Sequence, residues 1–347
     1  MKALKILLRV LLAAFLILAA CALIWRNAAA AVFHNLIAPR ADLTWPEDWE
    51  GGTVYERIPY SEVSPSDYLD LYVPEGEPKD LVVMVHGGGF VAGDSQTRQA
   101  RLVIRYFRDH GYAVASVNYR LVPEAVYPEP VADVKAAVRF LRAGADKYGY
   151  KADHITIMGE SAGGYLASMA ALTEDDECSS VPFIGEEDLA EPVSGHVQVL
   201  VDFYGCVELG NMEKDWESLG YPEALIKIAN SWASKDLLNG FENFESAFLG
   251  KNMSEMTGEE AYTYFPAYFA QKNLPGRDDL SVYIIHGDAD ITVPVLQSLR
   301  FCDTLSDLLP MEKAALRIVR KAGHAADAIY FDEELDRIRA FMEENRQ

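Results

Sequence analysis

Short apolar segments alternate with amphipathic ones along most of this 347-residue chain, from about residue 50 onward. Several apolar segments are rich in Val and Ile and nearly continuous, as is typical of parallel strands that are covered on both faces. The pattern predicts eight strands: Thr53–Tyr60, Tyr68–Val73, Leu81–Val85, Tyr112–Asn118, His154–Met158, Val197–Phe203, Ser281–Ile285 and Ala315–Val319. A Ser/Pro turn at 64–66 separates the first two strands, which we expect to form a hairpin.

Helical periodicity fills gaps between the predicted strands. The clearest helical ranges are Pro130–Lys147, Ala162–Leu172, Val293–Leu308 and Glu333–Asn345. Strands that mostly alternate with helices predict an α/β protein with one doubly wound, mostly parallel sheet.

Residues 207–277 interrupt this alternation, because they contain no clear strand. The segment is rich in Trp, Tyr and Phe, which predicts a helical insertion over one edge of the sheet. Two interpretations stay open: a lid over a site, or ordinary packing of aromatic side chains in the core. The predicted organisation is therefore an N-terminal hydrophobic anchor or signal segment over 1–30, a connecting segment over 31–50 and one folded domain over 51–347.

The N-terminal segment is the main indication of cellular location. Val10–Trp25 is an uncharged apolar run, which reaches twenty residues when it is extended back to Ile6 across Arg9. Twenty helical residues span roughly 30 Å, about one bilayer core, so we expect a retained membrane anchor. A cleaved secretory signal is the second interpretation, since small residues at 28–31 suit cleavage. A lipoprotein signal with a lipidated Cys21 is the third. All three place the folded domain outside the cytoplasm, either anchored to the membrane or secreted.

Composition excludes several classes of protein. Half of the residues are hydrophobic, which excludes a disordered chain. Lys and Arg number 31 against 53 Asp and Glu, and the formal net charge of −22 argues against a nucleic-acid partner, which needs clustered basic residues. The four cysteines (Cys21, Cys178, Cys206 and Cys302) are too few for a disulfide framework and lack metal-site spacing. We expect neither a metal nor an organic cofactor.

The strongest catalytic signal is Gly159-Glu160-Ser161-Ala162-Gly163-Gly164, which contains a G-x-S-x-G pattern. It follows one predicted strand and precedes a predicted helix. Glycines suit this position because the backbone is crowded in a sharp strand-to-helix turn. Such a turn presents the serine hydroxyl at the carboxyl edge of the sheet, so Ser161 is the candidate nucleophile.

A second signal, His86-Gly87-Gly88-Gly89-Phe90, directly follows the predicted strand Leu81–Val85. Acyl transfer develops negative charge on the carbonyl oxygen, and N–H donors that are already in place stabilise that charge. Glycines leave backbone N–H groups unshielded. We therefore expect Gly88 and Gly89 to form an oxyanion hole together with the N–H of Ala162, while His86 orients the loop.

A base and its partner acid should follow the serine, in the order acid, then histidine. His324 directly follows the last predicted strand, whereas His196 begins a strand and His286 ends one, so His324 is the candidate base. The acid should lie in the loop after the strand Ser281–Ile285. That loop contains Asp288 and Asp290, and position alone does not choose between them.

Together, these motifs resemble the α/β-hydrolase esterases and lipases, near the hormone-sensitive-lipase-like and BD-FAE-like acetyl and feruloyl esterases. The resemblance covers roughly residues 50–345 and rests on HGGGF with Gly93-Asp94, Asn118-Tyr119-Arg120-Leu121 with Pro123 and Glu124, GESAGG, HGDADITVP and Gly323-His324. It implies an α/β-hydrolase fold, and its pattern HG-x-x-D-x-x-V-P places the acid on Asp290. It also implies structural roles for Tyr119-Arg120, Pro123 and Asp133. The chain departs from the pattern at Glu160, where many relatives have Asp, and in 207–277, which matches no pattern.

We therefore expect a serine carboxylic-ester hydrolase in which Ser161 attacks, His324 transfers the proton and Asp290 orients the histidine. The expected substrates are small-molecule or carbohydrate esters with short acyl chains, such as acetylated or feruloylated sugars. Two alternatives are a serine peptidase of the same fold and a catalytically inactive, membrane-tethered binding module. The complete set of catalytic residues argues against the binding module, which would need none of them.

Overall fold

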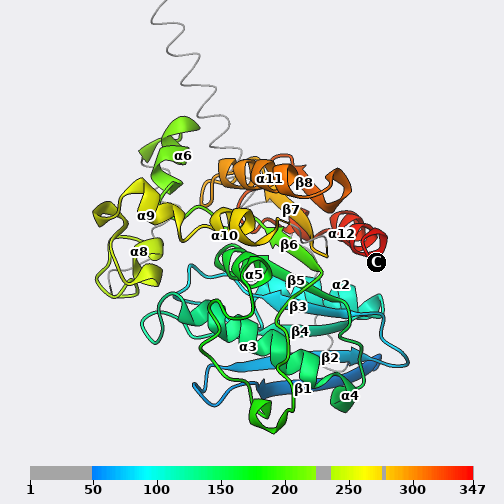
Figure 1. The fold of residues 1–347 in the computed structure, drawn as a ribbon. Coiled ribbons are helices and arrows are strands. Elements are labelled where there is room, and N and C mark those ends of the chain that lie inside the picture. The colour runs from blue at the N-terminus through cyan, green and yellow to red at the C-terminus, as the bar shows by residue number, and fades with distance from the viewer. Residues whose placement is uncertain (1–48, 224–235, 276–278, 347) are drawn as a thin grey trace, which may run out of the picture.

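The computed structural model describes residues 49–223, 236–275 and 279–346, and its centre is an eight-stranded sheet (Figure 1). The strand order is β1-β2-β4-β3-β5-β6-β7-β8. The strands are β1 (Gly52–Pro59), β2 (Tyr68–Pro74), β3 (Leu81–Val85), β4 (Ala113–Val117), β5 (Ile155–Glu160), β6 (Val199–Phe203), β7 (Ser281–Gly287) and β8 (Ala314–Val319). All eight predicted strands are present, so the predicted α/β class is confirmed.

Pairing in the sheet is mostly parallel. Parallel pairing joins six neighbouring strands, in the order β4, β3, β5, β6, β7 and β8. Strand β2 runs antiparallel to both of its neighbours, β1 and β4. The predicted opening hairpin is therefore confirmed. In the register of the central strands, Val85 on β3 faces Gly159 on β5, and Phe203 on β6 faces Ile285 on β7. The carboxyl ends of these strands consequently lie at one edge of the sheet, where the loops with the candidate motifs begin.

Helices cover both faces of the sheet, as the continuous apolar strands require. On β3, Val83 and Val85 belong to one hydrophobic core, and Val82 and Met84 belong to the other. The first face carries α3 (Glu129–Ala143), α4 (Ala145–Tyr148), α5 (Ala162–Leu172), α10 (Pro266–Asn273) and α11 (Leu296–Leu308), and the second carries α2 (Arg98–Asp109) and α12 (Asp332–Glu344).

Two predicted helical ranges need correction. The range Pro130–Lys147 is interrupted at Gly144, which caps α3 through its N–H to the Phe140 carbonyl oxygen and separates α3 from α4. Glycine weakens a helix interior, which accounts for the break. The helix predicted from Val293 begins only at Leu296, and Pro294 disfavours a helical backbone at the preceding Val293.

The segment between β6 and β7 contains no strand in its described parts. Its elements are α6 (Met212–Ser218), α8 (Phe244–Leu249), a 3₁₀ helix η2 (Met253–Glu255), α9 (Gly258–Tyr262) and α10. Helices α6, α8 and α9 lie together beside the sheet (Figure 1). Phe248 of α8 is fully buried and stacks on Phe90, with ring centroids 3.9 Å apart. The predicted helical insertion thus packs partly into the core.

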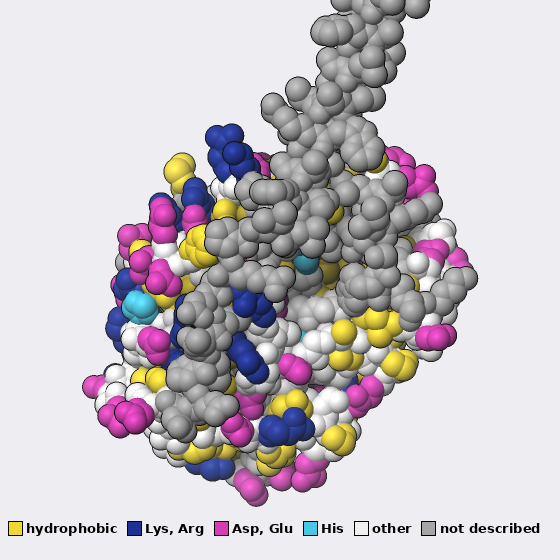
Figure 2. Space-filling view, turned by 180° about the vertical axis from the view of Figure 1, so that it is seen from behind, with side chains coloured by type: hydrophobic (Ala, Val, Ile, Leu, Met, Phe, Trp, Pro, Cys, Tyr) yellow, Lys and Arg dark blue, Asp and Glu magenta, His cyan; other side chains and the backbone are white. Residues whose placement is uncertain are grey.

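Acidic side chains are spread over the face shown in Figure 2, with basic and hydrophobic ones among them. Among the described residues, no helix combines the length and apolar character needed to cross a membrane. Residues 1–48 lie outside the described part. The anchor, the cleaved signal and the lipidation of Cys21 therefore stay predictions.

Candidate active site

Ser161 lies in the turn between β5 and α5, with φ of +52°, a backbone conformation that non-glycine residues rarely adopt. The turn is tight because the chain passes close to itself. A Cβ on Gly159 would lie 2.1 Å from the Gly163 carbonyl oxygen, and one on Gly163 would lie 2.3 Å from that of Val85. The glycines of the motif are therefore required by close backbone approach, and the turn raises the Ser161 side chain above the carboxyl edge of the sheet.

His324 and Asp290 complete a hydrogen-bonded chain with Ser161. The Nε2 atom of His324 lies 3.0 Å from Ser161 Oγ, and its Nδ1 atom lies 2.7 Å from Asp290 Oδ2. His324 follows β8, whereas Asp290 follows β7. Three loops that are distant in sequence thus meet because their strands end at the same edge. This is the arrangement in which a histidine accepts a serine proton while a carboxylate holds the ring.

The carboxylate of Asp290 is buried and well supplied with donors. Its Oδ1 atom accepts hydrogen bonds from the N–H groups of Thr292, at 2.8 Å, and Val293, at 2.9 Å. Its Oδ2 atom lies 3.3 Å from Nε2 of a second buried histidine, His286. Asp288, in contrast, is exposed and accepts from the Lys321 N–H. The geometry therefore distinguishes the two aspartates that sequence position could not.

Charge coupling shifts the pKa values of both partners. Burial alone would raise the pKa of Asp290, but the positive charge of His324 and the hydrogen bonds from His286 and His324 hold it well below the ordinary value. Burial acts to lower the pKa of His324, but the charge and hydrogen bond of Asp290, together with the charge of Glu160, raise it. Asp290 therefore stays ionised and stabilises an imidazolium at position 324.

The tri-glycine loop after β3 contains two glycines with positive φ. Gly88 has φ of +123°, and a Cβ there would lie 1.9 Å from the Ala92 carbonyl oxygen. Gly89 has φ of +61° and packs against the ring of Phe244. Among the described residues, neither amide of Gly88 or Gly89 donates a hydrogen bond. Both glycines line the same cavity as Ser161, and Ala162 is buried at the start of α5.

His86 is fully buried beneath this loop and stacks on Tyr119, with ring centroids 4.4 Å apart. Its Nδ1 atom lies 2.7 Å from the Gly87 carbonyl oxygen, and Tyr119 donates to the His86 carbonyl oxygen at 3.0 Å. Burial lowers the pKa of His86 to about 4, so the ring stays neutral. Asp133 holds the Arg120 guanidinium at 2.7 Å. These contacts show that His86, Tyr119 and the Arg120–Asp133 pair brace the loops near the site.

A buried cluster around Glu160 was not identified from the sequence. Glu160 accepts from the Gly87 N–H at 3.3 Å and from the hydroxyl of Tyr204 at 2.9 Å, and a further tyrosine, Tyr330, lies 3.3 Å away. Burial raises the pKa of Glu160, while these hydrogen bonds oppose the rise. The ring of Tyr204 meets His324 edge to face at 4.8 Å. The cluster therefore links the tri-glycine loop to His324. The one sequence signal for this cluster was the Glu at position 160, where many relatives have Asp.

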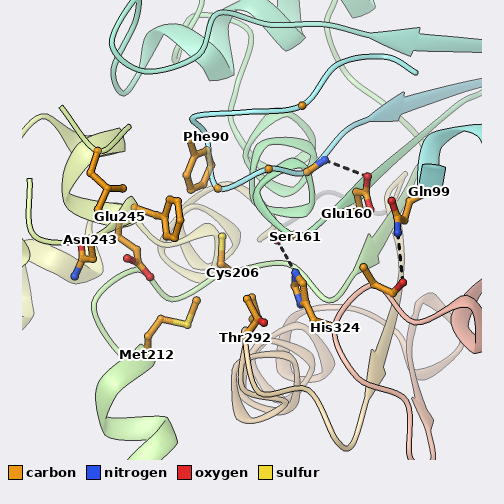
Figure 3. A pocket seen from close by; sticks show the side chains of 18 of the residues that line it. Phe90, Gln99, Glu160, Ser161, Cys206, Met212, Asn243, Glu245, Thr292 and His324 are labelled. Atoms are coloured by element: carbon orange, nitrogen blue, oxygen red, sulfur yellow. Dashed lines mark hydrogen bonds between the residues drawn. The ribbon is translucent and has the colours of Figure 1, made fainter. Parts of the chain in front are cut away.

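A cavity of about 720 Å³ opens over Ser161 and His324, a size suited to small organic ligands. On one side of the Ser161–His324 pair lie Glu160 and Gln99, and on the other lie Cys206, Met212 and Glu245 (Figure 3). Several lining residues come from the insertion, among them Met212, Glu213, Trp216, Leu238, Glu242, Asn243, Phe244 and Glu245. Aromatic enrichment pointed to Trp216 and Phe244, but no sequence signal selected the acidic residues. The insertion thus packs partly into the core and also forms part of the lining of the cavity.

Three of the four cysteines lie in the described part of the chain. Cys178, Cys206 and Cys302 are free thiols, and burial raises the pKa of Cys206, which faces the cavity. Within residues 49–223, 236–275 and 279–346, no group of three or more His, Cys, Asp or Glu residues is arranged to hold a metal ion.

The BD-FAE family matches residues 69–305, which is more than half of the sequence, and the chain belongs to this family. Esterase LipC of Mycobacterium tuberculosis is 26% identical over 276 residues, which are 79% of this chain and 60% of LipC. The acetyl esterase of Salmonella schwarzengrund is 34% identical over 116 residues, a third of each protein. This chain therefore spans less than two thirds of the length of these curated relatives.

A truncated carbohydrate esterase from gut microbiota has a similar structure, with a TM-score of 0.65 and 23% identity over 86% of this chain and 98% of the other. At this identity the likeness concerns the fold, and it agrees with the eight-stranded, mostly parallel sheet described above. The chain has the α/β-hydrolase fold that the sequence motifs implied.

Proposed function

We propose that this protein is a serine carboxylic-ester hydrolase that acts on esters with short acyl chains. The observation that carries the proposal is the hydrogen-bonded chain from Ser161 Oγ through His324 to the buried carboxylate of Asp290, with distances of 3.0 and 2.7 Å. It lies beside a loop whose glycines Gly88 and Gly89 line the same cavity. Membership of the BD-FAE family and the similarity to proteins named esterases support the same activity.

In this proposal, Ser161 Oγ attacks the acyl carbon while His324 Nε2 accepts its proton. The negative charge that develops on the carbonyl oxygen is stabilised by the N–H groups of Gly88, Gly89 and Ala162. Collapse of the tetrahedral intermediate expels the alcohol, which takes the proton from His324, and leaves an acyl-serine. Water then attacks the acyl-serine with His324 again as base, which restores the free serine and releases the acid.

For the substrate, we propose acetylated or feruloylated carbohydrate. Support comes from the family and from relatives and structural neighbours that are named acetyl esterase and carbohydrate esterase. We further propose that residues 1–30 retain the protein at the membrane, with the domain outside the cytoplasm. This is tested by fractionation: the full chain should sediment with membranes, and a variant that lacks 1–30 should be soluble and active. A mature protein secreted with its N-terminus near residue 30 would instead favour signal cleavage.

The hydrolase proposal is tested with a fluorophosphonate probe and p-nitrophenyl acetate. The probe should label Ser161 in the wild-type protein, and Ser161→Ala should abolish both labelling and turnover. Ser306→Ala, an exposed serine on α11, is the matched control and should change neither. Absence of labelling in a folded wild-type protein would contradict an activated nucleophile and would favour a binding module. Cleavage of peptides faster than esters would favour a peptidase.

A further inference from the structure

His286 lies near the end of β7, in the segment that leads to Asp290, and its side chain is fully buried. Its place at a strand end suggested only a structural role, and the reaction proposed above does not use it. A buried polar side chain needs hydrogen-bond partners, because its removal from water is otherwise unfavourable. The partners of the two ring nitrogens therefore show which parts of the site depend on this residue.

Both nitrogens of the His286 ring have partners. Nδ1 lies 2.7 Å from the hydroxyl of Ser298, which is fully buried on α11. Nε2 lies 3.0 Å from the Val293 carbonyl oxygen and 3.3 Å from Asp290 Oδ2. Because both neighbours of Nε2 are acceptors, this nitrogen carries a proton. In the neutral ring, Nδ1 then accepts from the Ser298 hydroxyl, and Ser298 thereby supports the tautomer that presents a donor to Asp290.

His286 acts on the Asp290 carboxylate by two routes. The direct route runs from Nε2 to Oδ2, the same oxygen that lies 2.7 Å from His324 Nδ1. The indirect route passes through Val293, whose carbonyl oxygen bonds His286 and whose N–H donates to Asp290 Oδ1 at 2.9 Å. The ring therefore fixes both the oxygen that faces His324 and a residue of the turn that holds the other oxygen.

Titratable side chains from several elements surround these rings. Those that the described structure places against His286, Asp290 or His324 come from β5, β6 and the loops after β6, α6 and β7: Glu160, Asp202, Tyr204, Tyr221 and Asp290. Burial raises the pKa of Asp202 to about 6, although the charge of His286 acts to lower it. The hydrogen bond from His286 helps to hold the pKa of Asp290 well below its ordinary value. A donor that stabilises the carboxylate in this way weakens its hold on an imidazolium at position 324.

We propose that His286 is a positioning residue for Asp290. Its Nε2 proton holds Oδ2 of that carboxylate toward His324, and Ser298 supports the ring from the other side. The inference rests on the proposed hydrolase function and adds a residue that acts only through Asp290. His286 is not among the described residues that line the cavity over Ser161, so it does not meet the substrate. Its replacement should therefore change kcat and the pH profile, whereas KM should change little.

The test compares two substitutions of His286, with p-nitrophenyl acetate as the substrate. His286→Leu removes the donor, and kcat should fall by about ten- to a hundredfold, the size expected for a hydrogen bond to a charged group. KM should stay within about twofold of the wild-type value. The acid limb of the pH profile of kcat/KM should move up by roughly half a pH unit, because Asp290 then acts more strongly on the imidazolium of His324 and raises its pKa. His286→Gln keeps an N–H near the place of Nε2 and should restore most of kcat and of the position of the limb.

Two further variants separate the role of the ring from its burial. Ser298→Ala keeps the ring but removes the partner of Nδ1, so kcat should fall by about threefold, with a smaller shift of the acid limb in the same direction. His154→Leu is the matched control. His154 is a buried histidine that directly precedes β5, at the opposite end of that strand from Ser161, and its replacement should leave both kcat and the acid limb unchanged.

Circular dichroism would show which variants are folded. An acid limb that is unchanged, or that moves to lower pH, in folded His286→Leu would overturn the positioning role and leave the hydrolase function intact. If that variant is unfolded, the same result in Ser298→Ala would overturn the role. A wild-type protein that does not hydrolyse p-nitrophenyl acetate would instead contradict the hydrolase function itself.

Discussion

Replacing Asp290 by Asn should nearly abolish turnover while preserving the fold. The Asn side chain has the same shape, and its carbonyl oxygen can still accept from the N–H groups of Thr292 and Val293, at 2.8 and 2.9 Å. Its NH₂ group would then replace the oxygen that accepts from His324 Nδ1 at 2.7 Å. An NH₂ group cannot accept, so the neutral imidazole would carry its proton on Nε2. That nitrogen could no longer accept the proton of Ser161.

We expect kcat on p-nitrophenyl acetate to fall by about 10⁴-fold, the loss observed when a comparable triad is forced into the wrong tautomer. Asp288→Asn is the matched control, because Asp288 is exposed and bonds the Lys321 N–H. It should cost about threefold or less. Circular dichroism of both variants would establish that they are folded. A larger loss of kcat in the Asp288 variant than in the Asp290 variant would refute the reasoning. Equal small losses would indicate that another acid partners His324, and Asp327, which pairs with Arg98 at 2.6 Å, is the next candidate.

Three further predictions follow from the cavity, the glycine loop and the Glu160 cluster. With a cavity of about 720 Å³, kcat/KM should be higher for acetate and butyrate esters than for a sixteen-carbon ester, as a p-nitrophenyl series would measure. Gly88→Ala should lower kcat by about 100-fold or more, whereas Gly76→Ala, also at positive φ but with open space around it, should not. Glu160→Gln removes a negative charge that raises the pKa of His324, so the acid limb of the pH profile of kcat/KM should move to lower pH. An acid limb at the same pH in the variant and the wild-type protein would contradict this.

The strands and the catalytic turns were predictable because their physical signals are local. A parallel strand covered on both faces must be apolar along its length, and several of the predicted segments carry that pattern; β3 and β6, for example, are buried throughout. The turn at Ser161 needs glycines at 159 and 163 because backbone atoms approach within a few ångströms there. The same holds for Gly88 in the loop after β3. The glycines that meet this requirement lie within the motifs themselves, so a short stretch of sequence reveals them, although Gly163 approaches the distant Val85.

The choice between Asp288 and Asp290 could not be made from periodicity, because both aspartates lie in the same loop two positions apart. Family resemblance pointed to Asp290, and the structure gives the physical reason. The loop turns so that the N–H groups at 292 and 293 bond the Asp290 carboxylate, which fixes its side chain beside His324. In the described part of the chain, Asp288 has no such donors from its own loop and bonds the Lys321 N–H instead.

The acidic wall of the cavity was unpredictable for a different reason. Glu245 is one of 53 acidic residues, and nothing in its neighbourhood in the sequence distinguishes it from a solvated glutamate. Its place in the cavity wall depends on tertiary packing: Phe248, one turn later on α8, is buried against Phe90 and holds the helix against the tri-glycine loop. Glu245 consequently lines the cavity (Figure 3).

This arrangement separates the chemistry of the site from its selectivity. Ser161, Asp290 and His324 are held at strand ends whose positions are set by the register of the sheet. The wall that contains Glu245 is held by the packing of short helices in the insertion. Changes at strand ends should therefore act on kcat for every ester, because they alter the reacting atoms. Changes in the wall should act on the ratio between esters, because they alter only the groups that meet the remainder of the substrate.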